Sequence, residues 1–198
     1  MIKNKVIYID PPWSYDGNVM KTKTGDSTVS KQYKTMTDQE LLSFPINDFA
    51  DNDCYIFMWT TSPKLDFGIE LLKHWGFEYK TCLVWKKEYN KRGGYGQGTY
   101  FQIITEFLLF GKRGNLKQFH SGKPNFLNAE WRGHSKKPQQ FRTLIENCTH
   151  GLKPRIEIFA REKPHDWDVF GNDPKLQNIS LESFQLIPTK ITEGNSNV

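Results

Sequence analysis

The stretch VIYIDPPW, residues 6–13, decides the fold of this chain. Its first four residues are apolar, and a short apolar run bounded by a turn signal predicts a buried strand. The two prolines behind Asp10 stop that strand and stiffen the backbone, so the aspartate is held at the carboxyl end of the strand. Ligands of open α/β sheets bind at that edge. We therefore expect a ligand site beside Asp10.

The candidate catalytic residues are Asp10, Pro11, Pro12 and Trp13. They combine a carboxylate, a stiff turn whose prolines offer carbonyls but no N–H group, and a flat aromatic side chain. Such a set can accept hydrogen bonds from an amino group while the aromatic side chain stacks on or walls the ring that carries the amine. The exocyclic amine of adenine or cytosine fits this chemistry. The structural alternative is a strand-ending turn followed by a core tryptophan.

Composition indicates an ordinary single domain with a basic character. The 198 residues are enough for one buried core, with 37% apolar and 14% aromatic residues. The net charge of +5 and the isoelectric point near 9.0 favour a polyanionic partner. We expect one domain over residues 1–174 and a loose tail over residues 175–198, because the sequence turns polar and loses its periodicity there.

Cysteine and histidine usage predicts neither a disulfide framework nor a metal site. Cys54, Cys82 and Cys148 lie far apart in apolar surroundings, which is typical of buried thiols in a reducing compartment. The histidines are scattered, and no zinc spacing is present. The sequence shows neither an apolar signal core at its start nor a spanning stretch, so we expect a cytoplasmic protein with no membrane partner.

Alternating strand and helix patterns predict an α/β fold. Further strands are expected at residues 54–60, 77–85, 105–110 and 155–161. Helices are expected from the capping box Thr37–Glu40 to near Pro45, from Ser62 to Gly76, and from Pro138 to Gly151, the last with Phe141, Leu144, Ile145 and Cys148 on its apolar face. Crossover helices between strands predict a mostly parallel sheet with helices on both faces.

Three loops carry much of the basic charge, at residues 14–33, 86–100 and 112–137. Cations mixed with glycine and tyrosine are expected where a chain meets phosphates and unstacked bases, although solvated surface loops are the simpler explanation. The glycine-rich run at residues 93–98 is not a dinucleotide fingerprint, because a strand and not a helix follows it. The candidate nucleic-acid-binding residues are Lys21, Lys23, Tyr33, Lys91, Arg92, Tyr95, Arg132 and Lys136.

These residues together resemble the adenine-N6 methyltransferase family that includes the eukaryotic messenger-RNA adenosine methyltransferase and its bacterial and phage relatives. The similarity runs from Ile7 to about Asp173, and the order and spacing of its motifs make it specific. The motifs are DPPW at 10–13, YKTMTD at 33–38, FMWT at 57–60, WGFE at 75–78, WK at 85–86, Glu106 with FGKRGN at 110–115, SKKP at 135–138, IEIFAR at 156–161 and GND at 171–173.

The resemblance implies a Rossmann-like methyltransferase fold that uses S-adenosylmethionine, with the catalytic motif ahead of the main cofactor-binding elements. Only nine residues precede Asp10, so we expect the cofactor to be held largely by later segments. Lys137 would meet the methionine carboxylate near the positive end of the following helix. The cofactor-binding residues that the family implies are Asp10, Lys137, Glu157, Arg161, Asn172 and Asp173.

The activity that the resemblance implies is direct methyl transfer to the N6 amine of adenine, with DNA favoured over RNA as the nucleic-acid partner by analogy. A cytosine-N4 methyltransferase would use the same four residues, and a glutamine-amide methyltransferase uses a related motif after its cofactor half. A non-catalytic nucleic-acid-binding partner with the same fold is a further alternative. The sequence indicates no partner chain, and it agrees with either a monomer or a homodimer.

Overall fold

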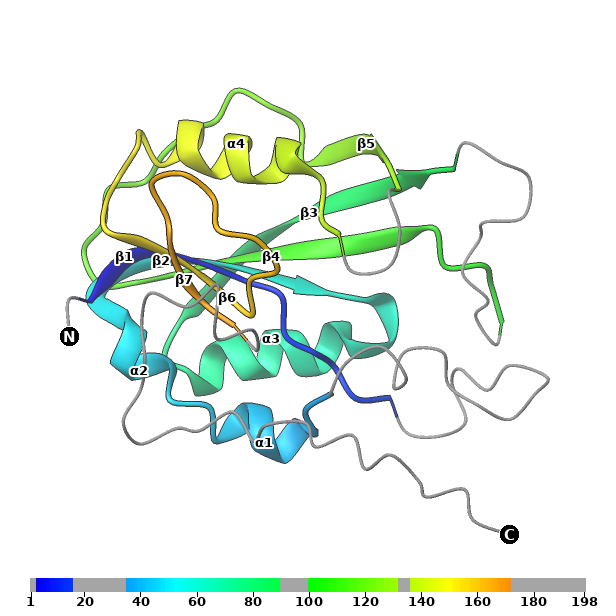
Figure 1. Ribbon diagram of the computed structural model, residues 1–198, viewed down its shortest axis with the longest axis horizontal. Coiled ribbons are helices and arrows are strands. Elements are labelled where there is room, and N and C mark those ends of the chain that lie inside the picture. Colours follow the sequence, from blue (N-terminus) through cyan, green and yellow to red (C-terminus); the bar gives the residue numbers. More distant parts are fainter. Residues whose placement is uncertain (1–2, 16–34, 90–99, 132–135, 172–198) are drawn as a thin grey trace, which may run out of the picture.

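The computed structural model describes residues 3–15, 35–89, 100–131 and 136–171, and these residues form a seven-stranded sheet with helices on both faces (Figure 1). The predicted boundary near residue 174 and the predicted tail at 175–198 lie outside the described residues. None of the described helices is long and apolar enough to cross a membrane.

The sheet is mostly parallel, as the sequence predicts. Its strands, in chain order, are β1 (Asn4–Ile9), β2 (Ala50–Thr60), β3 (Glu78–Glu88), β4 (Thr105–Arg113), β5 (Phe126–Glu130), β6 (Arg155–Ile158) and β7 (Asp168–Phe170). Their order across the sheet is β5-β3-β4-β2-β1-β6-β7. β4 runs antiparallel to its neighbours β2 and β3, whereas the other neighbouring pairs in this sheet are parallel. The amino end of β4 therefore lies at the edge where the other strands end.

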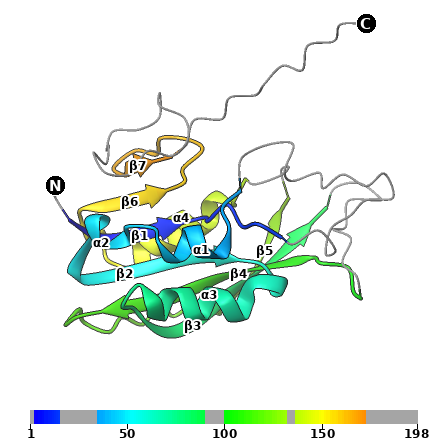
Figure 2. The same cartoon turned by 90° about the horizontal axis from the view of Figure 1, so that it is seen from below.

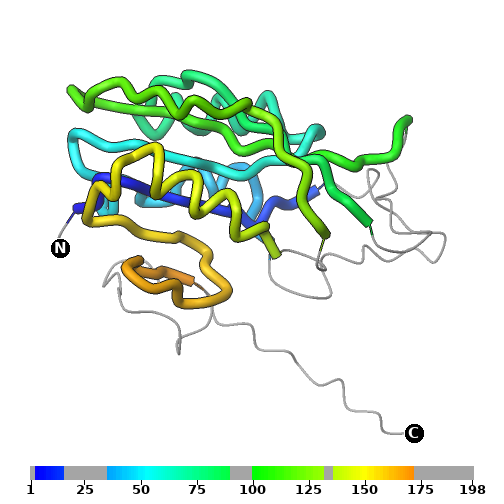
Figure 3. The backbone as a smooth tube through the Cα atoms, turned by 90° about the horizontal axis from the view of Figure 1, so that it is seen from above, coloured from blue at the N-terminus to red at the C-terminus, as the bar shows by residue number. Residues whose placement is uncertain are grey.

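The helices cover both faces of the sheet. α4 (Gln139–Cys148) lies across one face, while α1 (Asp38–Leu42), α2 (Ile46–Phe49) and α3 (Leu65–His74) cover the other, as Figures 2 and 3 show from opposite sides. The capping box that predicts α1 is present, since Thr37 Oγ1 accepts from Glu40 N at 3.2 Å and Glu40 Oε2 accepts from Thr37 N at 2.7 Å. The backbone N–H groups of Thr37 and Glu40 are thereby both hydrogen-bonded.

β1 shows why the run at residues 6–9 is continuously apolar. Ile7 and Ile9 belong to the core beneath α1, α2 and α3, whereas Val6 and Tyr8 belong to the core under α4. A strand that is buried on both faces cannot alternate between apolar and polar residues. The prolines then fix Asp10 just beyond the strand, at the edge of the sheet that holds the site.

Several predicted boundaries are wrong in detail. The strand expected at 155–161 ends at Ile158, because Phe159 takes a φ of 61°, which no extended strand allows. The helix expected from Ser62 begins with a 3-10 turn, Ser62–Lys64, before α3. β5, β7 and α2 were not predicted at all. Leu144 is only half-buried, whereas Arg142, which was not expected there, is one of the buried residues of α4.

All three cysteines are free, which agrees with the expected absence of a disulfide framework. Cys54 and Cys148 are buried as predicted, but Cys82 is half-buried on β3.

Candidate active site

The predicted catalytic turn lies at the carboxyl end of β1, with Asp10 partly exposed and the next three residues buried. Trp13 N donates to the Pro11 carbonyl at 2.9 Å, and Met36 N donates to the Pro12 carbonyl at 2.7 Å. A carbonyl oxygen has two lone pairs, so Pro11 keeps acceptor capacity for a ligand. The backbone bonds hold the turn rigid behind Asp10.

Trp13 is held in the hydrophobic core behind the turn. Its side chain is 6% exposed, its Nε1 donates to the Trp59 carbonyl at 3.2 Å, and its ring meets Phe67 of α3 edge-on. So little exposed ring surface agrees with the structural alternative of a core tryptophan, and a role for Trp13 beside the base stays a prediction.

Lys137 joins Asp10 to a second carboxylate. Lys137 Nζ lies 2.8 Å from Asp10 Oδ2 and 3.2 Å from Glu106 Oε2, and Glu106 Oε1 lies 2.6 Å from Lys87 Nζ. Glu106 reaches this point because it is the second residue of the reversed strand β4. The four side chains are each at most 24% exposed. They form an ion-pair chain in which cations and carboxylates alternate.

The charge states of this chain follow from burial and pairing. Burial raises the pKa of the Asp10 carboxyl, and Lys137 opposes that shift. Burial would also raise the pKa of Glu106, but Lys137 and Lys87 outweigh it and hold that pKa below its usual value. Burial would lower the pKa of the Lys137 ammonium, yet the two carboxylates outweigh it and hold the pKa above its usual value. Lys137 and Glu106 therefore stay charged at neutral pH.

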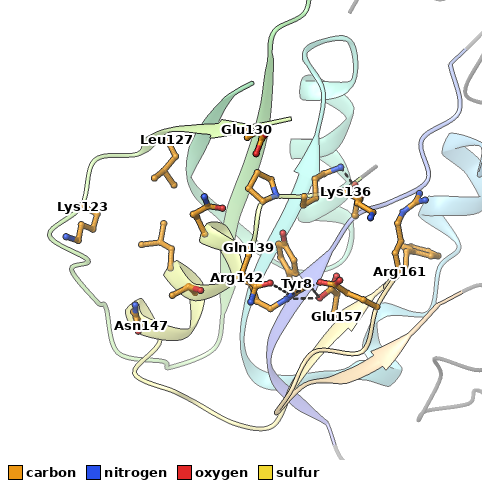
Figure 4. Close-up of a pocket in the computed structure, with 18 of the residues that line it drawn as sticks. Tyr8, Lys123, Leu127, Glu130, Lys136, Gln139, Arg142, Asn147, Glu157 and Arg161 are labelled. Carbon is orange, nitrogen blue, oxygen red and sulfur yellow. Dashed lines mark hydrogen bonds and ion pairs between the residues drawn. The ribbon is translucent and has the colours of Figure 1, made fainter. Parts of the chain in front are cut away.

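A pocket of about 870 Å³ opens where β1 and β6 end beside the first turn of α4 (Figure 4). Asp10, Lys137, Glu157 and Arg161 line one part of it, and the rest follows β5 and the outer side of α4. Tyr8 also lines the pocket, and its hydroxyl accepts from Trp59 Nε1 at 2.7 Å. The pocket is thus lined by cations, carboxylates and apolar side chains.

Five of the predicted site residues that the structure describes line this pocket, whereas Pro11, Pro12 and Trp13 are buried behind Asp10 and are not among its lining residues. Asp10, Lys137, Glu157 and Arg161 converge in the pocket, and Lys136 is exposed at its rim. Nine predicted residues lie outside the described part of the chain, namely Lys21, Lys23, Tyr33, Lys91, Arg92, Tyr95, Arg132, Asn172 and Asp173.

Sequence reasoning missed Lys87 and Arg142. Lys87 lies on β3, near the edge of the sheet where Asp10 lies. Arg142 follows Phe141 in the apolar stripe of α4, and a cation in a buried stripe is the signal that would have found it. Glu106 appeared only as part of a motif, because its place at the site depends on the reversed direction of β4.

The MT-A70 family matches residues 4–173 of this chain. The chain belongs to the MT-A70 family. That match covers every element described above and all of the predicted site residues, from Asp10 to Asp173. The MT-A70 assignment confirms the predicted resemblance and the Rossmann-like methyltransferase fold.

The chain covers very different shares of its curated relatives' own length. The type II methyltransferase M.MunI of Mycoplasma sp is 34% identical over 185 residues, which cover 85% of this chain and 77% of M.MunI. The human N(6)-adenosine-methyltransferase catalytic subunit METTL3 is 30% identical over 190 residues, 90% of this chain but 29% of METTL3. An MT-A70-like protein of Drosophila melanogaster is 30% identical over 194 residues, again 29% of that relative.

Proposed function

We propose that this chain transfers the methyl group of S-adenosylmethionine to the N6 amine of adenine in nucleic acid. One observation carries the proposal: Asp10 lies at the carboxyl end of β1, behind a rigid turn, in contact with Lys137 and within a pocket large enough for a nucleoside-sized ligand. The MT-A70 assignment and the N(6)-adenosine-methyltransferases among its relatives support the same activity.

The pocket has the donor and acceptor groups that the cofactor needs. Lys137 and the amino end of α4 offer positive charge to the methionine carboxylate. Glu157 offers a carboxylate to the ribose hydroxyls, and Arg161 lies beside it at the rim. Asn172 and Asp173 are proposed for the ribose and adenine, on the resemblance alone. When bound, S-adenosylmethionine supplies a methyl group that its sulfonium makes electrophilic.

The chain's own residues grip and orient the accepting amine. Asp10 and the Pro11 carbonyl accept the two N6 hydrogens, which draws the nitrogen lone pair out of the ring and towards the methyl carbon. With S-adenosylmethionine bound, the N6–carbon bond would form as the carbon–sulfur bond breaks, and N6 would then give up one proton towards Asp10 and solvent. The Asp10 carboxylate stabilises positive charge on N6, and loss of such a preorganised group costs about a hundredfold or more in rate.

Positioning supplies much of the remaining rate gain, because the nitrogen, carbon and sulfur must lie in line. Trp13 limits where the base can lie, since it is held by Trp59 and Phe67. A base within a duplex has to be flipped out before it reaches Asp10.

We infer DNA as the substrate and the cytoplasm as the location. DNA is supported by the match to M.MunI, which extends along most of both sequences, whereas the chain covers less than a third of METTL3. Lys136 at the pocket rim, with the predicted cations of the three loops, would meet the phosphates.

The test uses purified protein, S-adenosylmethionine labelled in the methyl group, and DNA and RNA of the same adenine-containing sequence. N6-methyladenine in DNA is the expected product, and Asp10→Ala should lower the rate at least about a hundredfold. Asp10→Asn is the matched variant, since it keeps the shape but removes the charge. Undiminished transfer by Asp10→Ala excludes the mechanism.

The same assay separates the alternatives. N4-methylcytosine as the product would assign the cytosine reaction, and product in RNA alone would replace DNA. Salt-dependent nucleic-acid binding without calorimetric heat on S-adenosylmethionine would identify a non-catalytic binding protein.

A further inference from the structure

Arg142 is a buried cation whose guanidinium faces into the pocket wall. It lies on α4 between residues that pack on the sheet, and it is 8% exposed. Its Nε and Nη2 both donate to Glu157 Oε2, at 3.1 and 2.8 Å, while Nη1 reaches Gln139 Oε1 at 3.2 Å and Glu162 Oε1 at 3.1 Å. Figure 4 shows Arg142 and Glu157 joined across the gap between α4 and β6.

In this geometry only one oxygen of the Glu157 carboxylate is hydrogen-bonded to Arg142. Both bonds from Arg142 go to Oε2, and within the described residues Oε1 accepts no hydrogen bond. Two guanidinium donors that converge on Oε2 hold this oxygen, and with it the Glu157 side chain, more firmly than a single ammonium could. Glu157 lines the pocket, so one of its oxygens is held and the other is left for a ligand.

We propose that Arg142 is a positioning residue that orients the Glu157 carboxylate towards the ribose hydroxyls of the cofactor. This inference rests on the proposed function and deepens it, because it adds a residue that acts through Glu157 and not by touching the cofactor's reacting atoms. The remaining oxygen, Oε1, has two lone pairs, so it can accept from both hydroxyl groups of one ribose.

The charge of Glu157 also depends on Arg142. Burial raises the pKa of Glu157 to about 7, and Arg142 is the group that opposes this shift. The other groups that act on it are Glu162 after β6 and Asp10 after β1, which raise the pKa further. Tyr8 lies opposite Glu157 on β1, and on β7 the opposing residue is Val169, which does not titrate. Without Arg142, Glu157 would take up a proton at a higher pH and would lose its value as an acceptor.

A purely structural role for Arg142 predicts a different result. If Arg142 only ties α4 to β6, its loss lowers the free energy of unfolding, and the cofactor affinity of the folded variant keeps its wild-type dependence on pH. A positioning role instead makes the loss of cofactor affinity depend on pH, because protonated Glu157 is the species that binds poorly. The pH profile therefore separates the two roles.

The experiment measures the affinity of the full chain for S-adenosylmethionine and S-adenosylhomocysteine by calorimetry, from about pH 6 to about pH 9. Wild-type affinity should rise with pH and level off as Glu157, with its pKa of about 7, becomes charged. Arg142→Gln should bind roughly tenfold more weakly at neutral pH, with its midpoint moved to higher pH. Glu157→Gln should remove the pH dependence. In methyl transfer, Arg142→Gln should show its loss chiefly as a raised KM for S-adenosylmethionine.

Arg142→Lys keeps the charge and removes the fork, and it decides the question if Arg142→Gln does not fold. It should bind several times more weakly than wild type with a midpoint close to the wild-type value. Arg155→Lys is the matched control, because Arg155 is also a buried arginine of this sheet. Its Nε donates to the Asp166 carbonyl at 3.1 Å, and Arg155 does not line the pocket. That control should leave affinity and midpoint unchanged.

Three outcomes overturn the inference, and they are distinguishable. A wild-type midpoint in Arg142→Gln, or wild-type affinity in Arg142→Lys, removes the positioning role while the proposed function stands. A wild-type protein that binds neither cofactor form at any pH removes the proposed function, and this inference falls with it.

Discussion

Lys137 Nζ lies 2.8 Å from Asp10 Oδ2, although 127 positions separate the two residues in the sequence. The contact joins the turn behind β1 to the residue that precedes the first turn of α4. It places a fixed positive charge against the carboxylate that we propose for catalysis, and it links the two halves of the pocket. The charge balance of the site therefore depends on one lysine.

Lys137→Met should destabilise the fold by about 3 kcal/mol, because breaking a buried pair leaves the Asp10 carboxylate without its cation, while Glu106 keeps only Lys87. Asp10 and Glu106 would then face each other across an apolar side chain. Adding Glu106→Gln should restore part of the lost stability. Urea unfolding of both variants tests this, with the exposed Lys73→Met on α3 as the control. Equal stability of Lys137→Met and wild type would mean that the ion-pair chain contributes nothing.

The lowered pKa of Glu106 predicts that the fold loses stability in acid. Burial acts against the shift, but Lys137 and Lys87 hold the pKa below the ordinary value of 4.5. The unfolded chain then binds the proton more readily, so the contribution is present above pH 4.5 and is lost as the pH falls through the folded-state pKa. Unfolding free energies from about pH 7 to about pH 3 should fall less steeply for Glu106→Gln than for wild type. Glu70→Gln, on the exposed side of α3, should follow the wild-type curve.

The sequence was most informative where local chemistry alone sets the structure. The apolar run of β1, the capping box at Thr37 and the prolines behind Asp10 each act within a few residues, and each was predicted correctly. The reversed direction of β4 depends on pairing with β2 and β3, which no local pattern encodes. β7 has only three residues, too few for a periodic pattern.

The same distinction between local and long-range causes applies to the residues of the site. Asp10, Lys137 and Glu157 could be placed because the family resemblance supplied their roles, and the structure brings them into one pocket. Arg142 could not, because its partner Glu157 belongs to another element and the pairing exists only when α4 packs on β6. A charged residue in an apolar stripe is a signal, but the sequence does not say which carboxylate it meets.

Substitution of Arg113 should lower the stability of the fold and leave the activity unchanged. It ends β4 at the edge opposite Glu106, donates to the carbonyls of Asp51 and Ala50, each at 2.8 Å, and lies over Phe77. A lysine cannot donate to both carbonyls as the guanidinium does, so the free energy of unfolding of Arg113→Lys should be lower by about 1–3 kcal/mol. Lys80→Gln, which removes an exposed ion pair, should change stability by less than about 1 kcal/mol. A fall in kcat for Arg113→Lys at a temperature where it stays folded would contradict this separation.

Gly171 is required by a close backbone approach. A Cβ at this position would lie 2.6 Å from the Ala160 carbonyl oxygen, and Ala160 N donates to the Phe170 carbonyl at 3.2 Å beside it. Backbone cannot give way as a side chain can, so Gly171→Ala should push the end of β7 from Ala160, destabilise the fold by about 1–3 kcal/mol and weaken cofactor binding through the neighbouring Arg161.

Gly68→Ala on α3 is the matched control for Gly171→Ala, because its nearest neighbour is Leu109 Cδ1 at 3.1 Å, the end of a side chain that can rotate. Alanine also favours a helix over glycine by about 1 kcal/mol, which offsets the crowding. Urea unfolding and calorimetry with S-adenosylmethionine should therefore show a loss in Gly171→Ala and little change in Gly68→Ala. Equal effects of the two substitutions would show that the approach of Gly171 to Ala160 places no constraint on the pocket.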